Sequence, residues 1–308
     1  MEDYPRTLME FERRFVSEEA CRAYLVRLRW PGGVQCLRCQ ESRVWPTRRG
    51  LYHCARCGYQ TSVLAGTIFQ DTKQPLRLWF RAIWYVTNQK SGVSALGLQR
   101  ALGLGSYQTA WMWLHKLRRA MVRPGRDRLT GEVEVDETYV GGVEPRGGKR
   151  HVGNKALVAI AAQADGAGIG RIRLRRIPDA SSQSLAAFIK EAIEPGTRVV
   201  TDGWEGYTAL KEAGYKHRPK VIRGSGKMAL TLLPRVHRVA SLLKRWWLGT
   251  HQGAVSRDHL DYYLDEFTFR FNRRRSRWRG KLFYRLVQQA VQAPPVRPGP
   301  IRKIHPRA

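Results

Sequence analysis

The most marked shortage in this sequence is of acidic residues. Its 308 residues include 25 Asp and Glu against 55 Lys and Arg, a formal net charge of +30. Such an excess of cations favours a polyanionic partner, because neutralising phosphates releases condensed counterions. Ten Trp residues interleaved among the basic ones point to nucleic acid. The alternative is a basic surface with no such partner.

Long apolar runs are also missing. None approaches the roughly 20 residues that a membrane-spanning helix needs. The start, MEDYPRTLMEFERRF, is charged and lacks the apolar stretch of a signal peptide. We therefore expect a cytoplasmic protein that associates with the nucleoid and not with a membrane.

Cysteines are few, and four of the five are paired in sequence. In a reducing compartment we expect thiols or metal ligands and no disulfides. Two CxxC turns with fourteen residues between them can complete a tetrahedron around a structural Zn²⁺. A redox CxxC is the alternative, but two pairs in a short β-rich segment favour a ribbon. The predicted ligands are Cys36, Cys39, Cys54 and Cys57, and Cys21 is expected to be a buried thiol.

The pattern along the chain divides it into five parts. The predicted parts are an N-terminal helical segment (1–30), a zinc ribbon (31–68), a helix-turn-helix-like segment (70–125), a larger α/β domain (130–290) and a basic Pro/Arg-rich tail (291–308).

Two helices around a Gly-Leu-Gly turn form the helix-turn-helix-like segment. Ser94 and Ser106 are placed to cap them. The second helix begins with polar residues that could meet base edges in a major groove, namely Tyr107, Gln108 and Thr109. The alternative is an ordinary helical hairpin whose apolar stripe, Trp111, Leu114 and Leu117, is core.

One stretch concentrates acid in this basic chain. In EVEVDETYVGG (132–142), strict alternation puts Glu132, Glu134 and Asp136 on one strand face and two valines on the other. Carboxylates on one face repel one another, so something positive should lie against them.

The elements after this strand predict a mixed sheet with the order β-β-β-α-β-α-β-α. We expect strands at 154–166 and 169–177, a helix at 181–193, a strand within 197–207, a helix around 207–213, a short strand at 221–222 and a helix over 234–248. In this topology the first and fourth strands are neighbours, so Asp136 and Asp202 can converge.

Two converging carboxylates are costly unless a cation lies between them, and Mg²⁺ or Mn²⁺ suits oxygen ligands. A pair of such ions can cut or join a phosphodiester. Glu132 and Glu134 either continue this face or pair with Arg or Lys of neighbouring strands. The alternative for Asp136 and Asp202 is that they merely end strands near turns.

Three stretches carry a family resemblance. VDETYVGG, VVTDGWEGY and HRVASLLKRWWLGTHQGAVSRDHLDYYLDEFTFRFNRR resemble the zinc-ribbon insertion-sequence transposases of the DDE, RNase H-like superfamily. The resemblance covers the chain from the ribbon to about Gln289. It implies an RNase H-like catalytic domain, Asp136 and Asp202 as the first two catalytic acids, double-stranded DNA as partner and at least a dimer on DNA.

The third catalytic position departs from the family pattern. Where an acid is expected on the helix after the fifth strand, this sequence has His237, with Lys244 two turns later on the same face in a DNA-contacting position. Imidazole suits Mn²⁺ better than Mg²⁺, so His237 is a weaker ligand, a proton shuttle or a sign of impaired activity. Glu266 is the rival third acid, although a solvated helix face also explains it.

A basic cluster follows Glu266. Its members are expected either to contact the DNA backbone or simply to end a helix: Arg270, Asn272, Arg273 and Arg274.

The resulting hypothesis is a metal-dependent transposase that binds element ends, cleaves them and joins them to target DNA. One alternative is a DNA-binding regulator that uses the ribbon and the helix-turn-helix alone. Another is a degraded transposase that binds DNA without cutting it.

Overall fold

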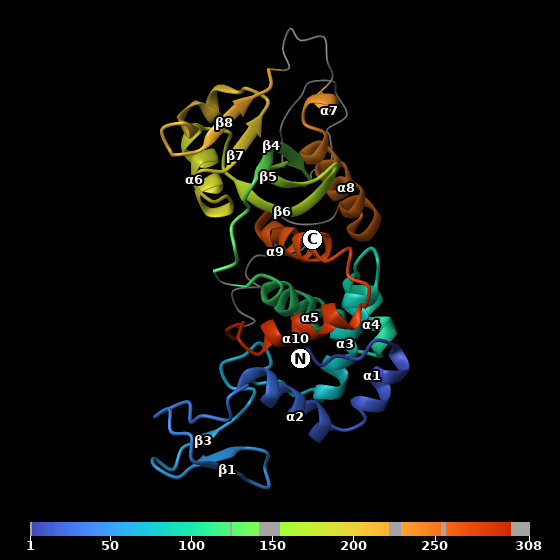
Figure 1. Ribbon diagram of the computed structural model, residues 1–308. Helices are drawn as coiled ribbons and strands as arrows, with labels where there is room; N and C mark the ends of the chain where they lie inside the picture. The colour runs from blue at the N-terminus through green and yellow to red at the C-terminus, as the bar shows by residue number, and fades with distance from the viewer. Residues whose placement is uncertain (1, 124, 142–154, 222–228, 254–256, 297–308) are drawn as a thin grey trace. The chain divides into compact units, whose positions relative to one another are not determined.

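The computed structural model describes residues 2–123, 125–141, 155–221, 229–253 and 257–296 (Figure 1). Its contacts divide the chain into two units. The described residues of Met1–Arg123 and Arg275–Ala308 form unit 1, and those of Pro124–Arg274 form unit 2. Among the described helices, none combines the length and the apolar character needed to cross a bilayer.

Unit 1 is mainly helical. Its helices are α1 (Leu8–Arg14), α2 (Glu18–Arg29), α3 (Leu76–Asn88), α4 (Ala95–Leu102), α5 (Tyr107–Ala120) and α10 (Gly280–Ala290). Ser94 and Ser106 cap α4 and α5 as predicted, each hydroxyl accepting an N–H three residues on. The left-handed Gly103 ends α4.

Helix α10 completes the core of unit 1, although it follows unit 2 in the chain. It packs on α3, α2 and α5, and its buried Phe283 ring contacts Phe11, Phe80 and Trp84. Pro5 carbonyl oxygen approaches Gly280 so closely that any side chain there would collide. The predicted range 130–290 grouped α10 with the sheet, because sequence order does not show which core an apolar helix face joins.

The ribbon of unit 1 is a three-stranded antiparallel sheet within the predicted range 31–68. Its strands are β1 (Val44–Pro46), β2 (Tyr52–Cys54) and β3 (Gln60–Thr61). Short strands bury little apolar surface, so the cysteines must supply much of this sheet's stability.

Unit 2 is built on a five-stranded mixed sheet. Its strands are β4 (Glu132–Val140), β5 (Ala156–Asp165), β6 (Gly168–Ile177), β7 (Arg198–Thr201) and β8 (Lys216–Pro219), in the order β6-β5-β4-β7-β8. β4 is central, antiparallel to β5 and parallel to β7. This confirms the RNase H-like architecture and the predicted pairing of the first and fourth strands.

The fifth strand was predicted at the wrong place. It lies at Lys216–Pro219, where β8 pairs with β7, and not at 221–222, of which Ile222 lies outside the described residues. β8 is a polar edge strand, so an apolar pattern could not reveal it. The helix expected around 207–213 is a short 3₁₀ segment, η1 (Glu205–Leu210).

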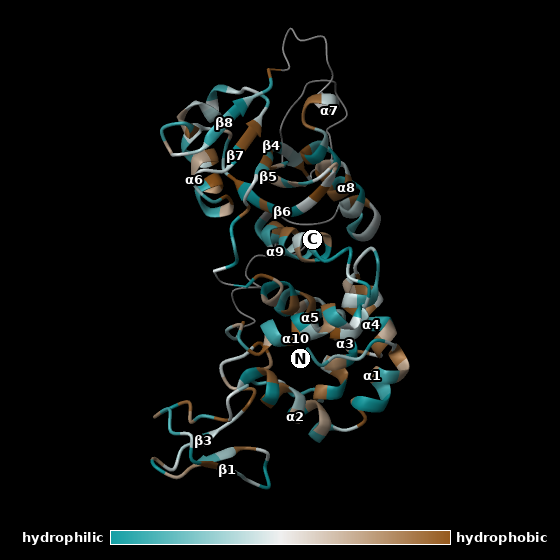
Figure 2. Ribbon diagram, in the orientation of Figure 1, coloured by the Kyte–Doolittle hydropathy of each residue, from teal (hydrophilic) through white to brown (hydrophobic). Residues whose placement is uncertain are grey.

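Helices cover both faces of the sheet. One core contains α6 (Ser182–Ala192) and η1, and the other contains α8 (Pro234–His251) and α9 (Leu260–Asn272). Figure 2 colours β7 as hydrophobic, and its Val199 and Val200 belong to the two different cores. The remaining described elements are α7 (Ala229–Leu232) and η2 (Arg257–His259).

Candidate active site and metal-binding residues

The four ribbon cysteines gather as predicted. Their sulfur atoms all lie within 4.8 Å of one another, with Cys36 and Cys57 3.6 Å apart and Cys39 and Cys54 3.5 Å apart. Within the described parts of the chain, they are the one group of three or more potential ligands this close together. Four thiol sulfurs in this arrangement fit a tetrahedral Zn²⁺. Cys21 is buried apart from them, and burial raises its pKa to about 12.

Strand register brings Asp136 and Asp202 to matching positions. Glu134 of β4 pairs in parallel with Val200 of β7, and each aspartate lies two residues beyond its member of that pair. Side chains two apart on a strand share a face, so Asp136 belongs to the face of β4 that α8 covers. Asp202 directly follows β7, and its charge acts to raise the pKa of both Asp136 and His237. The chain turns at once after Asp202, because Gly203 is left-handed and Asp202 Oδ1 accepts the Trp204 N–H at 3.0 Å.

The acids repel one another electrostatically. Burial raises the pKa of Asp136 to about 7, and the charges of Glu137 and Asp202 add to this rise. Burial also raises the pKa of Glu137, and Asp202 adds to that rise too. The three carboxyl groups therefore lie within electrostatic reach of one another, as expected of a site that accepts a cation.

His237 faces Asp136 from the first turn of α8. Its Nε2 lies 3.7 Å from Asp136 Oδ2, and this buried nitrogen has no hydrogen-bond partner among the described residues. Burial lowers the pKa of His237. A neutral imidazole beside a carboxyl whose pKa is about 7 is not a full ion pair at neutral pH.

This donor set fits a divalent cation. A buried nitrogen without a partner, next to carboxylates that repel each other, offers the mixed N and O ligands that suit Mn²⁺. Asp136, Asp202 and His237 do not gather as tightly as the cysteines do. Lys244 is exposed, and its charge also lowers the pKa of His237, so both side chains lie on one side of α8.

Glu137 and Tyr207 were not among the predicted site residues. The buried Tyr207 hydroxyl donates to Glu137 Oε2 at 2.6 Å, which opposes the rise in the pKa of Glu137. Glu137 belongs to the other set of alternating positions on β4, and Tyr207 is far away in sequence. No spacing signal links them, because their contact depends on how η1 packs on the sheet.

The remaining acids of the stripe have basic partners. Glu132 pairs with Arg198 of the neighbouring strand at 3.4 Å, one of the two alternatives predicted for it. Glu134 pairs at 2.9 Å with Arg235, which belongs to α8 and not to a strand.

Glu266, the rival third acid, lies elsewhere. It is buried on α9 and accepts from Arg270 Nε at 2.8 Å within the same helix. Helix α9 packs on β6, an edge strand, whereas Asp136 is on the central strand. The solvated-face explanation is wrong for Glu266, since only 1% of its surface is exposed.

The basic cluster at the end of α9 faces the sheet edge. Asn272 exchanges two hydrogen bonds with the Ile172 backbone, at 2.7 and 3.2 Å, and Arg274 donates to the Ile169 and Gly170 carbonyls. Arg273 stacks on the Phe269 ring. The hydrogen bonds of Asn272 and Arg274 therefore bind backbone groups of β6 that an edge strand leaves unpaired.

Helix α5 has both a polar N-terminal end and a buried apolar stripe, so it fits a DNA-binding helix and an ordinary helical hairpin alike. Tyr107 and Gln108 are exposed at its start and Thr109 is half-buried. The stripe of Trp111, Leu114 and Leu117 is buried, as an ordinary helical hairpin also requires.

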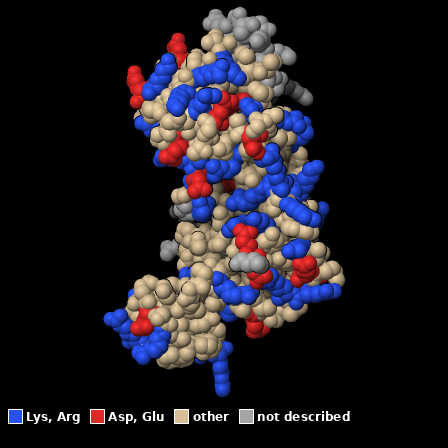
Figure 3. Space-filling view, in the orientation of Figure 1, with Lys and Arg blue, Asp and Glu red and all other residues tan. Residues whose placement is uncertain are grey.

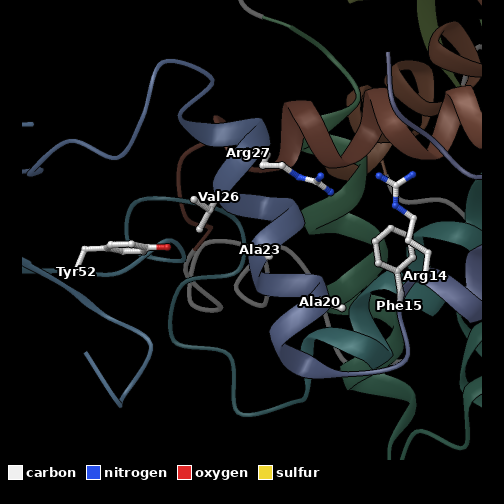
Figure 4. A pocket seen from close by; sticks show the side chains of 7 residues that line it. All are labelled: Arg14, Phe15, Ala20, Ala23, Val26, Arg27 and Tyr52. Atoms are coloured by element: carbon white, nitrogen blue, oxygen red, sulfur yellow. The ribbon is translucent and has the colours of Figure 1, made fainter. Parts of the chain in front are cut away.

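Basic side chains are spread widely over the surface. Blue Lys and Arg atoms far outnumber red acidic ones on the face shown in Figure 3. A hollow of about 450 Å³ lies beside α2 in unit 1, lined by Arg14, Phe15, Ala20, Ala23, Val26, Arg27 and Tyr52 (Figure 4). Both of its arginines pair with Asp3, and it contains no residue of the candidate active site.

Comparisons with known proteins agree with these features. Residues 128–272 match the family described as ISXO2-like transposase domain, and residues 16–60 match the family described as transposase zinc-ribbon domain. An uncharacterized protein in transposable element ISH50 of Halobacterium salinarum is 27% identical over 281 residues, covering 84% of this chain and 92% of that protein.

Two solved structures are also similar. The catalytic core domain of BIV integrase shares 16% identity with a TM-score of 0.29, over 44% of this chain and 81% of that one. A pre-cleavage Mos1 transpososome shares 14% identity with a TM-score of 0.26, over 71% of this chain and 79% of that one.

Proposed function

Because this chain belongs to the zinc-ribbon insertion-sequence transposases, we propose that it cleaves the DNA ends of such an element and joins them to target DNA. One observation carries the proposal. Asp136 on β4 and Asp202, the residue after β7, lie at matching positions relative to the parallel pairing of these strands, and His237 Nε2 lies 3.7 Å from Asp136 Oδ2. The protein would cleave and join DNA at the nucleoid, in the cytoplasm.

Asp136, Asp202 and His237 would hold Mg²⁺ or Mn²⁺. Bound divalent cations activate water or a 3′-hydroxyl and stabilise the leaving oxygen of a phosphodiester. Asp136 must ionise to bind a cation, so binding releases a proton near neutral pH, given its pKa of about 7. His237 offers an uncharged nitrogen, which favours Mn²⁺ over Mg²⁺. Zn²⁺ in the ribbon has a structural role.

DNA contacts are assigned to side chains that are exposed or half-buried. Lys244 is exposed on the side of α8 that carries His237 and would contact a phosphate near the cut. Tyr107, Gln108 and Thr109, at the start of α5, would help to recognise the ends. Asn272 and Arg274, at the end of α9, are not assigned to DNA, because both already form hydrogen bonds with the backbone of β6. Bringing two element ends together implies at least a dimer.

Strand transfer of an end-bearing duplex tests this proposal. Wild type is compared with Asp136→Asn and Asp202→Asn in Mn²⁺ and in Mg²⁺. We expect each variant to bind DNA normally and to lose about a hundredfold or more in joining. Binding by all three proteins with joining by none would favour a DNA-binding regulator or a degraded transposase.

The metal preference tests the role of His237. His237→Asp supplies an oxygen ligand, so joining in Mg²⁺ should rise relative to joining in Mn²⁺. His237→Ala should lower joining in both metals. Undiminished activity of the alanine variant would remove His237 from the site. Raising salt should weaken end binding steeply if several phosphates are neutralised.

A further inference from the structure

Glu134 is a buried acid that the proposed chemistry does not use. Only 2% of its side chain is exposed, on the central strand and two residues before Asp136. Burying a carboxylate is costly unless hydrogen bonds and a positive partner compensate for the lost water.

Both carboxylate oxygens of Glu134 bind the start of α8. Oε2 accepts the backbone N–H of Arg235 at 2.7 Å and of Val236 at 3.0 Å, and Oε1 accepts Arg235 Nη1 at 2.9 Å. The helix cannot cap itself, because Leu233 at its N-cap is apolar and Pro234 lacks an N–H. A residue of β4 therefore caps α8, and its negative charge also complements the positive end of the helix dipole.

Arg235 extends this link to a second place in the sheet. Its Nε donates to the carbonyl of Gly168, the first residue of β6, at 3.1 Å, and its Nη2 donates to the carbonyl of Gly166, in the turn before β6, at 2.9 Å. The first turn of α8 is thus tied both to β4 and to the β5–β6 hairpin. The next residue after Val236 is His237, whose Nε2 lies 3.7 Å from Asp136 Oδ2.

We propose that Glu134 is a positioning residue: through the first turn of α8 it holds His237 against Asp136. Glu134 and Asp136 lie two apart on β4, and their contacts on α8 follow each other in the same way, first Arg235 with Val236 and then His237. The importance of this alignment for DNA joining rests on the proposed function. The alignment itself can be measured without a catalytic metal or DNA.

The main test follows the first turn of α8 in the zinc-loaded protein without added Mg²⁺ or Mn²⁺. In Glu134→Ala, we expect amide hydrogen exchange at Arg235 and Val236 to speed up at least tenfold, because these N–H groups lose their acceptor. Carbethoxylation of His237 by diethylpyrocarbonate should also become at least several-fold faster, since its Nε2 is buried in the wild type. Both rates are read by peptide mass spectrometry.

Two variants separate positioning from general loosening. Glu134→Gln keeps an oxygen that can accept the two N–H groups and should restore most of the protection. Glu132→Ala is the matched control, since Glu132 lies on the same strand face but pairs with Arg198 at 3.4 Å and approaches α8 only at Arg235 Nη1, 4.0 Å away. It should behave as wild type, and exchange in β5 should be unchanged in all folded variants. If Glu134→Ala does not fold, Arg235→Ala takes its place, with a smaller increase expected.

The outcomes distinguish the two proposals. Unchanged exchange and unchanged His237 modification in Glu134→Ala would overturn the positioning role, whatever the activity. A wild type that joins no DNA would overturn the proposed function, even if both rates change as expected. If both proposals hold, Glu134→Ala loses at least tenfold in joining with normal DNA binding, and Glu134→Gln recovers part of that loss.

Discussion

The ribbon cysteines and the carboxylates around Asp136 are both candidate metal sites, but they reach their geometry in different ways. Each CxxC pair is brought together by a local turn, and the two pairs lie in one short segment. Asp136 comes from β4, Asp202 from the residue after β7 and His237 from α8, so this group is spread over about a hundred residues of chain.

Their energetics differ as well. The cysteine cluster belongs to a small sheet that buries little, so metal binding there is also folding energy. The carboxylates occupy a sheet whose two apolar cores fold around them, and their repulsion opposes folding until a cation arrives. The cysteines should therefore stabilise the fold through the metal that they bind. The carboxylates around Asp136 should destabilise the fold as long as no cation is bound.

Loss of one thiol should give the largest effect. Cys54→Ser removes a ligand from a tetrahedral site, and structural Zn²⁺ in small domains is worth roughly 10–16 kcal/mol. We expect loss of bound zinc and unfolding of 31–68, measured by zinc content and by proteolysis. The sheet of unit 2 should melt as in wild type. A variant that retains zinc and a protected ribbon would contradict the role of the cysteines.

Loss of the Asp136 carboxylate should stabilise the folded protein, whereas loss of a cysteine thiol destabilises it. The pKa of Asp136 is raised from 3.8 to about 7 in the folded protein, so the folded state holds a proton that the unfolded chain releases in this window. The stability of the wild type should therefore fall as pH rises from 4 to 7. Asp136→Asn should stabilise by on the order of 2–4 kcal/mol at pH 8 and by nothing at pH 3.

Thermal unfolding without added Mg²⁺ or Mn²⁺ measures this difference. Chelators must be avoided because they would remove the ribbon zinc. Added Mn²⁺ should stabilise wild type above pH 7 and leave Asp136→Asn almost unchanged. If the asparagine variant melts below wild type at pH 8, the contrast between the two sites fails.

Removing the Tyr207 hydroxyl should destabilise moderately. Tyr207→Phe leaves the Glu137 carboxylate without its 2.6 Å donor, which costs about 1–3 kcal/mol. That hydrogen bond lowers the pKa of Glu137, so the loss should grow as pH rises and Glu137 ionises. A double-mutant cycle with Glu137→Gln measures the coupling. Strict additivity would show that the two groups act independently.

The smallest effect is expected at Asp202. Burial raises the pKa of Asp136 and Glu137 more than the charge of Asp202 does. Asp202→Asn should therefore stabilise the protein without added cation, by less than about 1 kcal/mol. A gain as large as that of Asp136→Asn would mean that repulsion, and not burial, dominates the site.

Several features could be predicted from the sequence because they depend on local spacing or on the order of helices and strands along the chain. Ser94 and Ser106 cap their helices through the N–H three residues on, and the CxxC spacing alone brings the thiols together. Alternation in 132–140 predicted the central strand, and the order of elements made β4 and β7 neighbours. A solvated face stayed open as the alternative for Glu266, because its helical pattern does not tell which sheet edge α9 will cover.

Sequence alone determined the cysteine cluster, the central acidic strand and the pairing that aligns Asp136 with Asp202, since each follows from spacing or strand order. Tertiary structure alone decided that Glu134 caps α8, that Tyr207 reaches Glu137 and that Asn272 binds Ile172. These contacts join residues 70 to 102 positions apart. No periodicity encodes such contacts, because they depend on how whole elements pack and on which buried polar groups packing leaves without water.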